Sequence, residues 1–173
     1  MKKLTLSTRQ LAWVLLAIIP LWFGACSKGS TDVTPSAVTV QGSWLVGGYT
    51  IDPAFDILGT GTKTNDLLLL YKQLLGQDFV DCFKATTLTF NADGKVTGST
   101  TAKCASIGAS PVGSAATWTL AGSKLTIKDG TDVTVYDVSI NGTTLKLSET
   151  VTADFDRDNK NDTGTLSIVL TKA

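Results

Sequence analysis

Short runs of alternating hydrophobic and polar residues fill most of the chain beyond residue 41. Threonine and valine, which favour strands, are frequent in these runs, and Gly, Asn and Asp mark the turns between them. Because each run is joined to the next by turn residues, we expect an all-β domain, either an antiparallel barrel or a sandwich. The pattern predicts eight strands, over residues 42–51, the two arms of a hairpin in 85–102, 116–120, 125–129, 134–140, 144–155 and 164–172.

One segment, residues 64–79, breaks this alternation. Its apolar residues fall at spacings of three and four, which predicts an amphipathic helix of about three to four turns. Thr64 or Asn65 is the expected N-cap, and Gly76 lies near the expected C-terminus. A helix that packs on the sheet or plugs one end of a barrel explains the pattern. A helix on a membrane surface fits less well, because Lys72 is its one basic residue.

The N-terminus has a different pattern again. Lys2, Lys3 and Arg9 precede an unbroken apolar run over residues 11–23. This run of 13 residues is shorter than the roughly 20 that a membrane-spanning helix needs. A positive segment, a short apolar segment and small residues after it predict a secretory signal peptide over residues 1–25.

The end of this segment, Phe23-Gly24-Ala25-Cys26, resembles the lipobox of bacterial lipoproteins. In those proteins the signal is cut before the cysteine, and the thiol is joined to a diacylglycerol. The resemblance implies that Cys26 is lipidated and anchors the protein to a membrane. The alternatives are an ordinary signal peptide cut elsewhere and an uncleaved anchor.

Small and polar residues over 26–41 predict a flexible tether between the lipid and a domain over 42–173. No acidic run follows Cys26, whereas such runs direct some lipoproteins to the cell surface. We therefore expect a lipid-anchored protein in the envelope of a Gram-negative bacterium, on the outer membrane and facing the periplasm.

Charge and composition exclude some functions. The formal net charge is zero, and without Lys2, Lys3 and Arg9 the chain has 12 basic residues against 15 acids. Nucleic acid is not an expected partner, because phosphate binding needs a concentrated positive field. The chain has no histidine, which excludes catalytic triads that use one, and we expect no enzymatic activity.

Two cysteines, Cys82 and Cys104, remain once Cys26 is assigned to lipidation. They flank the hairpin predicted in 85–102, whose turn contains Asn91-Ala-Asp-Gly94. If this turn adds a one-residue bulge, Cys82 comes into register with Cys104. The turn chemistry therefore predicts a disulfide across the open end of the hairpin. A thiol pair that binds metal or does redox chemistry is less favoured, because the chain has no histidine and no C-x-x-C.

One acidic constellation lies before the last predicted strand. Asp154, Asp156, Asp158 and Asp162 resemble positions 1, 3, 5 and 9 of a calcium-binding loop. The glycine and the bidentate glutamate of such a loop are replaced by Asn159 and Thr165. A solvated acidic hairpin is the favoured interpretation, with calcium ligation as the alternative. No other cofactor is expected.

Several of these features together resemble the lipocalin-like lipoproteins of Gram-negative bacteria. Gly42-Ser-Trp44 is similar to the Gly-x-Trp motif of lipocalins, in which the Trp packs the closed end against a basic residue of the last strand. Here that residue is Lys172 instead of Arg. Further similarity lies in Cys82, the hairpin, Cys104 and the strands that follow. The resemblance implies a small up-and-down barrel of about eight strands, a bridged cysteine pair and one helix inserted after the first strand.

Two functions remain open at this stage. In the first, the barrel binds a small hydrophobic molecule, and Trp44, Trp118 and Tyr136 line or close the cavity. In the second, the barrel or sandwich is filled and serves as a structural or protein-interaction module of the envelope. The two differ in whether the inward side chains leave space, and the register of the strands is too uncertain at this stage to decide.

Overall fold

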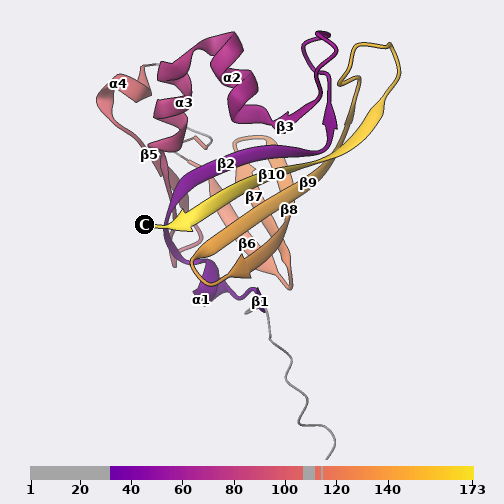
Figure 1. Ribbon diagram of the computed structural model, residues 1–173. Helices are drawn as coiled ribbons and strands as arrows, with labels where there is room; N and C mark the ends of the chain where they lie inside the picture. Colours follow the sequence, from indigo (N-terminus) through magenta and orange to yellow (C-terminus); the bar gives the residue numbers. More distant parts are fainter. Residues whose placement is uncertain (1–31, 107–111, 114) are drawn as a thin grey trace, which may run out of the picture. The chain divides into compact units, whose positions relative to one another are not determined.

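Eight strands run up and down in chain order and curl into a nearly closed antiparallel barrel (Figure 1). The computed structural model describes residues 32–106, 112–113 and 115–173. The predicted signal peptide over residues 1–25 and the lipidation site at Cys26 lie outside this part. The strands of the barrel are β2 (Gly42–Phe55), β4 (Thr87–Phe90), β5 (Val96–Ser99), β6 (Thr117–Ala121), β7 (Lys124–Asp129), β8 (Asp132–Asn141), β9 (Thr144–Ala153) and β10 (Asp162–Lys172).

The order of the sheet is β5-β4-β2-β10-β9-β8-β7-β6, so β2 pairs with β10 and the meander closes on itself. Strands β5 and β6 meet at an antiparallel bridge between Lys95 and Thr117. Beside it, the Val96 amide donates to the Ala116 carbonyl at 3.0 Å. The Trp118 amide donates to the Gly94 carbonyl at 2.7 Å. The predicted all-β, up-and-down barrel of eight strands is confirmed, and all eight strands overlap the predicted runs.

A bulge in β2 decides which of its residues face the interior. Opposite Leu170 and Val169 of β10 stand Val46 and Gly48, so Gly47 is the extra residue. Trp44 and Val46 are buried on one side of it, and Ile51 is buried on the other. Since side chains alternate along a strand, an uninterrupted strand would have placed Tyr49 and Ile51 outside.

The closed end of the barrel is built around Trp44 and Lys172, which face each other across β2 and β10. The Lys172 Nζ lies 4.4 Å from the centre of the Trp44 ring and donates to the Gln41 carbonyl at 2.9 Å. Gly42 has a φ of 115°, and a Cβ there would come within 2.7 Å of that Nζ. The Gly-x-Trp motif therefore has a physical reason: the glycine leaves room for the lysine that covers the tryptophan.

Residues just before β2 complete this end. Strand β1 (Asp32–Val33) pairs with β8, and helix α1 (Ala37–Val40) begins at Ser36, whose hydroxyl accepts from the Thr39 amide. The Trp44 Nε1 donates to the Val40 carbonyl at 2.8 Å. In the structure, residues 32–41 are therefore attached to the barrel, which differs from the flexible tether predicted over 26–41.

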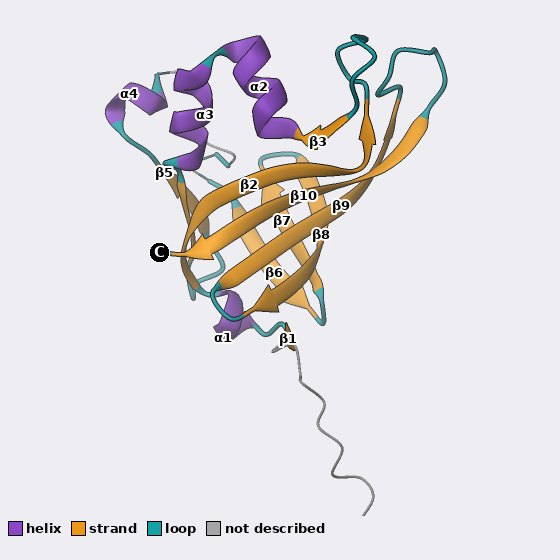
Figure 2. Ribbon diagram, in the orientation of Figure 1, coloured by secondary structure: helices purple, strands orange, loops and turns teal. Residues whose placement is uncertain are grey.

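The opposite end of the barrel carries helices (Figure 2). The helix predicted over residues 64–79 is in fact β3 (Thr64–Asp66), α2 (Leu67–Leu75) and α3 (Gln77–Lys84). Asp66, not Thr64 or Asn65, is the N-cap, since its carboxylate accepts from the Leu68 and Leu69 amides. Gly76 ends α2 as expected. With its φ of 90° it also precedes a second helix, α3, which begins at the next residue. No helix in the described part of the chain is long and apolar enough to cross a membrane.

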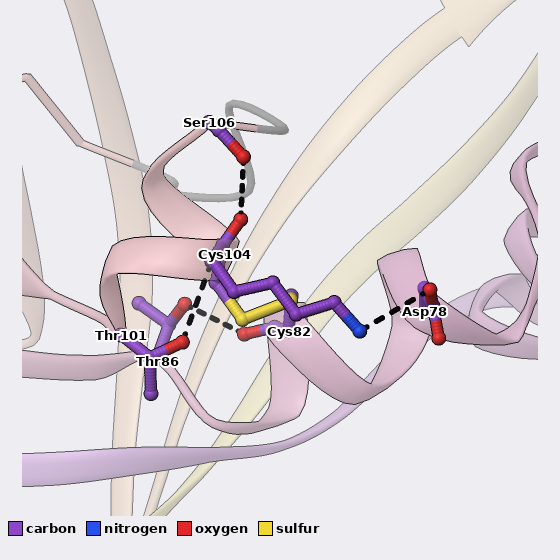
Figure 3. Close-up of a disulfide and its surroundings, with 7 residues drawn as sticks. Asp78, Cys82, Thr86, Thr101, Cys104 and Ser106 are labelled. Carbon is purple, nitrogen blue, oxygen red and sulfur yellow. Dashed lines mark hydrogen bonds and ion pairs between the residues drawn. A yellow bond between two sulfur atoms is a disulfide. The ribbon is translucent and has the colours of Figure 1, made fainter.

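The disulfide between Cys82 and Cys104 forms, but the two residues lie on helices (Figure 3). Cys82 belongs to α3, and Cys104 belongs to the short helix α4 (Ala102–Ala105). The β4–β5 hairpin between them has the predicted register, with Thr87 opposite Ser99 and Phe90 opposite Val96. The disulfide predicted across the open end of the hairpin is therefore present, and the residues that carry it belong to the helices on either side of β4 and β5. Figure 3 also shows the ion pair between α3 and α4, in which the Lys103 Nζ lies 3.3 Å from a carboxylate oxygen of Asp78.

The described residues, which begin at Asp32, belong to one compact unit that extends to the C-terminus. Its main core cluster fills the closed end and extends up to Leu68, Val80 and Phe83 of the two helices. A second cluster joins Ile51 and Phe55 of β2 to Leu67 and Leu70 of α2. The helices therefore cover the upper end of the barrel with apolar side chains, as the plug interpretation predicted.

Candidate functional site

The two predicted tryptophans serve the closed end of the barrel. Trp44 is 1% exposed, and its indole nitrogen is already bonded to Val40. Trp118 is 5% exposed, donates to the Asn91 carbonyl at 3.1 Å and packs edge-on against Phe90. Both side chains therefore close the barrel floor, and their nitrogens are occupied by the protein.

The predicted Tyr136 lies higher in the barrel, in a more polar layer. On β8 it shares a face with the buried Val138 and Ile140, and it packs against the core while remaining half-buried. Glu149 on β9 shares a face with the buried Leu145 and Leu147 in the same way. One step beyond the last β8–β9 pair, Tyr136 and Glu149 are neighbours on adjacent strands.

Tyr49 of β2 completes this layer. It stands opposite Ile168 of β10, which in turn stands opposite Leu147 of β9. Glu149 pairs with Leu166, the next inward residue of β10. The inward face thus changes from fully buried apolar residues near Trp44 to half-buried Tyr49, Tyr136 and Glu149 toward the helices.

Burial raises the pKa values of all three groups. Desolvation raises the pKa of the Glu149 carboxyl above its ordinary value. Burial, followed by the neighbouring Glu149 charge, raises the pKa of Tyr136. Burial also raises the pKa of Tyr49 well above its usual range, with smaller contributions from Tyr71, Glu149 and Tyr136. Strand pairing sets Tyr136 beside Glu149, and Tyr49 lies across β10 on the same inward face, so the three groups form one candidate site.

Aromatic rings from the helices lie over this layer. The rings of Tyr49 and Tyr71 are 5.9 Å apart between centroids, and Tyr49 and Phe83 are 6.2 Å apart. Tyr71 also meets Phe79 edge-on at 5.6 Å. Phe79 packs against the buried disulfide, so Cys82 and Cys104 support the helical cover from behind. The disulfide thereby helps to hold in place the helices that cover the candidate site.

An open cleft of about 520 Å³ lies between β2 and the two helices, and Tyr49 is one of its lining residues. It has a mixed lining with exposed lysine side chains at Lys72 and Lys84 and the backbone of the bulge at Gly47 and Gly48. Asp66 also lines it, but its carboxylate already caps α2. This cleft is open to solvent, and its lysines lie on the Tyr49 side of the layer, whereas Tyr136 and Glu149 do not line it.

The acidic loop before β10 brings together only part of the predicted calcium set. Single carboxylate oxygens of Asp154, Asp156 and Asp162 lie within 4.8 Å of one another. Asp158 is not in this group, since its carboxylate contacts Lys160 at 3.1 Å. Both Asp154 oxygens accept backbone amides, from Asp158 at 3.1 Å and Asn159 at 3.0 Å. The loop is thus closed in part by its own hydrogen bonds, and three of the four predicted carboxylates converge in it.

Sequence reasoning did not identify Tyr49, Tyr71 or Glu149 as parts of a site. A signal was present for Glu149, because it continues the odd-numbered inward positions Leu145 and Leu147. It is also the chain's one glutamate. For Tyr71 no such signal exists, because its position depends on how α2 packs over the barrel.

Comparison with known proteins agrees with the geometry. Residues 40–147 match the family model described as a lipocalin-like domain. Neither the curated proteins nor the solved structures contain a match to this chain. The match spans more than half of the chain and includes the Gly-x-Trp motif, the helical cover and the strands up to the middle of β9. The chain therefore belongs to the lipocalin-like domain family.

Proposed function

We propose that this protein is a lipid-anchored protein of the bacterial envelope that binds a small hydrophobic molecule in the upper half of its barrel. The lipocalin-like fold is typical of binding proteins more than of enzymes. One observation supports the choice of location: the floor is packed tightly around Trp44, whereas the half-buried Tyr49, Tyr136 and Glu149 bring polar groups to the inward face beside the buried cluster of Ile51 and Phe55. Polar groups at a few points of an apolar site are the usual means of orienting a ligand.

The anchor is proposed from the lipobox resemblance. Cys26 is expected to carry a diacylglycerol, on the outer membrane and facing the periplasm. The expected result is that the full chain, produced in a Gram-negative host, incorporates a labelled fatty acid and sediments with the outer membrane. Cys26→Ser should abolish the labelling. Labelling that survives this substitution would overturn the assignment.

A filled barrel that serves as a structural or interaction module is the second candidate. It is favoured by Leu68, Val80 and Phe83, which extend the core cluster from the strands into the helices. In that case the helices are a plug, and the half-buried layer is simply the upper boundary of the core.

Native mass spectrometry of residues 27–173, secreted to the periplasm and purified without detergent, separates the two candidates. This segment contains the whole compact unit and its disulfide. A bound lipid-sized mass that disappears on denaturation is the expected result. If only the bare chain is found, and if isothermal titration calorimetry detects no binding of added decanol, the binding function is wrong and the filled module stands.

A further inference from the structure

Within the part of the chain that the structure describes, no ion pair balances the charge of the Glu149 carboxylate. Among the described residues, no hydrogen bond or ion pair engages it, and desolvation is the cause that raises its pKa. The neighbouring lysine of its strand, Lys146, alternates to the opposite face and is exposed. At the closed end, by contrast, the Lys172 ammonium lies over the Trp44 ring and donates to the Gln41 carbonyl.

The described groups whose charges influence the tyrosine pKa values of this layer are tyrosines and one carboxylate, and none of them is a cation. These groups are Tyr49 of β2, Tyr71 of α2, Tyr136 of β8 and Glu149 of β9. A carboxylate that loses water without gaining a cation costs free energy, and a ligand that brings the cation would offset this cost. Tyrosine rings add to such a site, because the face of an aromatic ring attracts an ammonium group. An anionic head group beside Glu149 would meet repulsion, because the lysines of the open cleft lie on the Tyr49 side of the layer.

Apolar residues surround the charged layer on both sides. Leu166 stands opposite Glu149 and belongs to the upper cluster with Ile51 and Phe55. Gly164 lies further along β10, and a Cβ there would come within 3.2 Å of Ile51 and Phe55, so the glycine lets this cluster pack. A ligand in this layer would therefore meet one anionic point, aromatic faces and otherwise hydrocarbon.

We propose that the ligand of this barrel is a cationic amphiphile: a molecule with an apolar body and a positively charged nitrogen that Glu149 binds beneath Tyr49 and Tyr136. This inference rests on the proposed function, because it names the class of ligand for the same site. It assigns Glu149 the part of a specificity-determining residue. The open cleft beside Lys72 and Lys84 offers the opposite charge, so it makes a different prediction for anionic ligands.

The test compares three probes with one tail, decyltrimethylammonium, decyl sulfate and decanol, by isothermal titration calorimetry on residues 27–173. We expect the ammonium to bind at least about tenfold more tightly than the alcohol, and the sulfate more weakly than both. Glu149→Gln should remove the preference for the ammonium and leave the alcohol affinity within about twofold. Asp132→Asn removes the same charge from the exposed start of β8 and should change nothing.

Glu149→Leu provides a second variant with an apolar side chain at this position. It should fold, bind decanol at least as well as the unchanged protein and show no preference for the ammonium. If the sulfate binds as tightly as the ammonium, or if the preference survives in both Glu149 variants, the inference is wrong while the binding function stands. If none of the three probes binds the unchanged protein, the proposed function itself fails, and the inference fails with it.

Discussion

The disulfide of this domain allows a quantitative prediction of what its removal costs. Cys82 and Cys104 are 22 residues apart along the chain. In the chain-entropy treatment, a cross-link over that separation lowers the entropy of the unfolded state by the equivalent of about 3.4 kcal/mol at 25 °C. Replacing both cysteines by alanine should therefore reduce the free energy of unfolding by at least about 3 kcal/mol. For a domain of this size, that corresponds to a fall in melting temperature of roughly 10 °C.

Packing adds to this value in the alanine variant. Both sulfurs are buried, with Cys82 4% and Cys104 5% exposed, and Phe79 packs against them. Their loss leaves a small cavity behind α3, worth about 1 kcal/mol more. Reduction of the unchanged protein keeps the sulfurs in place, so it should cost only the entropic part. The difference between the reduced protein and the alanine variant measures the packing part.

Urea unfolding followed by tryptophan fluorescence is the assay, because Trp44 and Trp118 report on the barrel floor, away from the helices. Lys103→Ala is a matched control, since the Lys103–Asp78 ion pair also links α4 to α3. Both side chains of this pair are highly exposed, so its removal should cost less than about 1 kcal/mol. A loss below about 1 kcal/mol in the double alanine variant would refute the reasoning. It would mean that the β4–β5 hairpin already holds the two cysteines close together in the unfolded chain.

Three further predictions concern single side chains. Lys172→Met removes the ring contact with Trp44 and the bond to Gln41, and it should lower the free energy of unfolding by about 1–2 kcal/mol; an unchanged urea midpoint would contradict this. Because the pKa of Glu149 is raised, the folded domain keeps this proton longer than the unfolded chain, so the associated stability is complete below about pH 4 and is lost as the pH rises through the folded pKa. Glu149→Gln should therefore be more stable than the unchanged protein at about pH 7 and lose this advantage near pH 4, as urea midpoints at both pH values will show. Millimolar calcium should leave the melting temperature unchanged, because backbone amides close the acidic loop; a rise that Asp156→Ala abolishes would establish a calcium site instead.

The strands were predictable because period-two alternation and turn residues are local signals. The β4–β5 register followed in the same way from the Asn91–Gly94 turn, and with it the proximity of Cys82 and Cys104. The register alone could not show whether the chain reaches these cysteines as strand or as helix, since either continuation keeps them close. Thr86 lies between α3 and β4, and its hydroxyl donates to the Cys82 carbonyl at 3.0 Å. That bond joins the last turn of α3 to the start of the hairpin, and the hydrophobic pattern of the sequence does not predict it.

The break at Gly76 was missed for a related reason. Leucines up to Leu75 and the aromatic Phe79 continue one helical spacing, and a single glycine inside a helix is tolerated at a cost of about 1 kcal/mol. Its positive φ depends on how α2 and α3 both pack over the barrel. The site itself was missed at Glu149 because its inward direction follows from the parity of Leu145 and Leu147, which is known only once these leucines are shown to be in the core.

The two ends of the barrel treat charge in opposite ways, and this contrast is the strongest argument for a function at the helical end. At the closed end the Lys172 cation is satisfied by the Trp44 ring and the Gln41 carbonyl, so the charge supports the fold. At the helical end the Glu149 carboxylate lies among tyrosines and leucines with nothing in the described protein to balance it. A barrel that served only as a filled module would gain stability from leucine at this position, because an apolar replacement removes the desolvation cost. The unpaired carboxylate therefore does not serve the stability of the fold. Its surroundings support the proposal that it binds a cationic ligand.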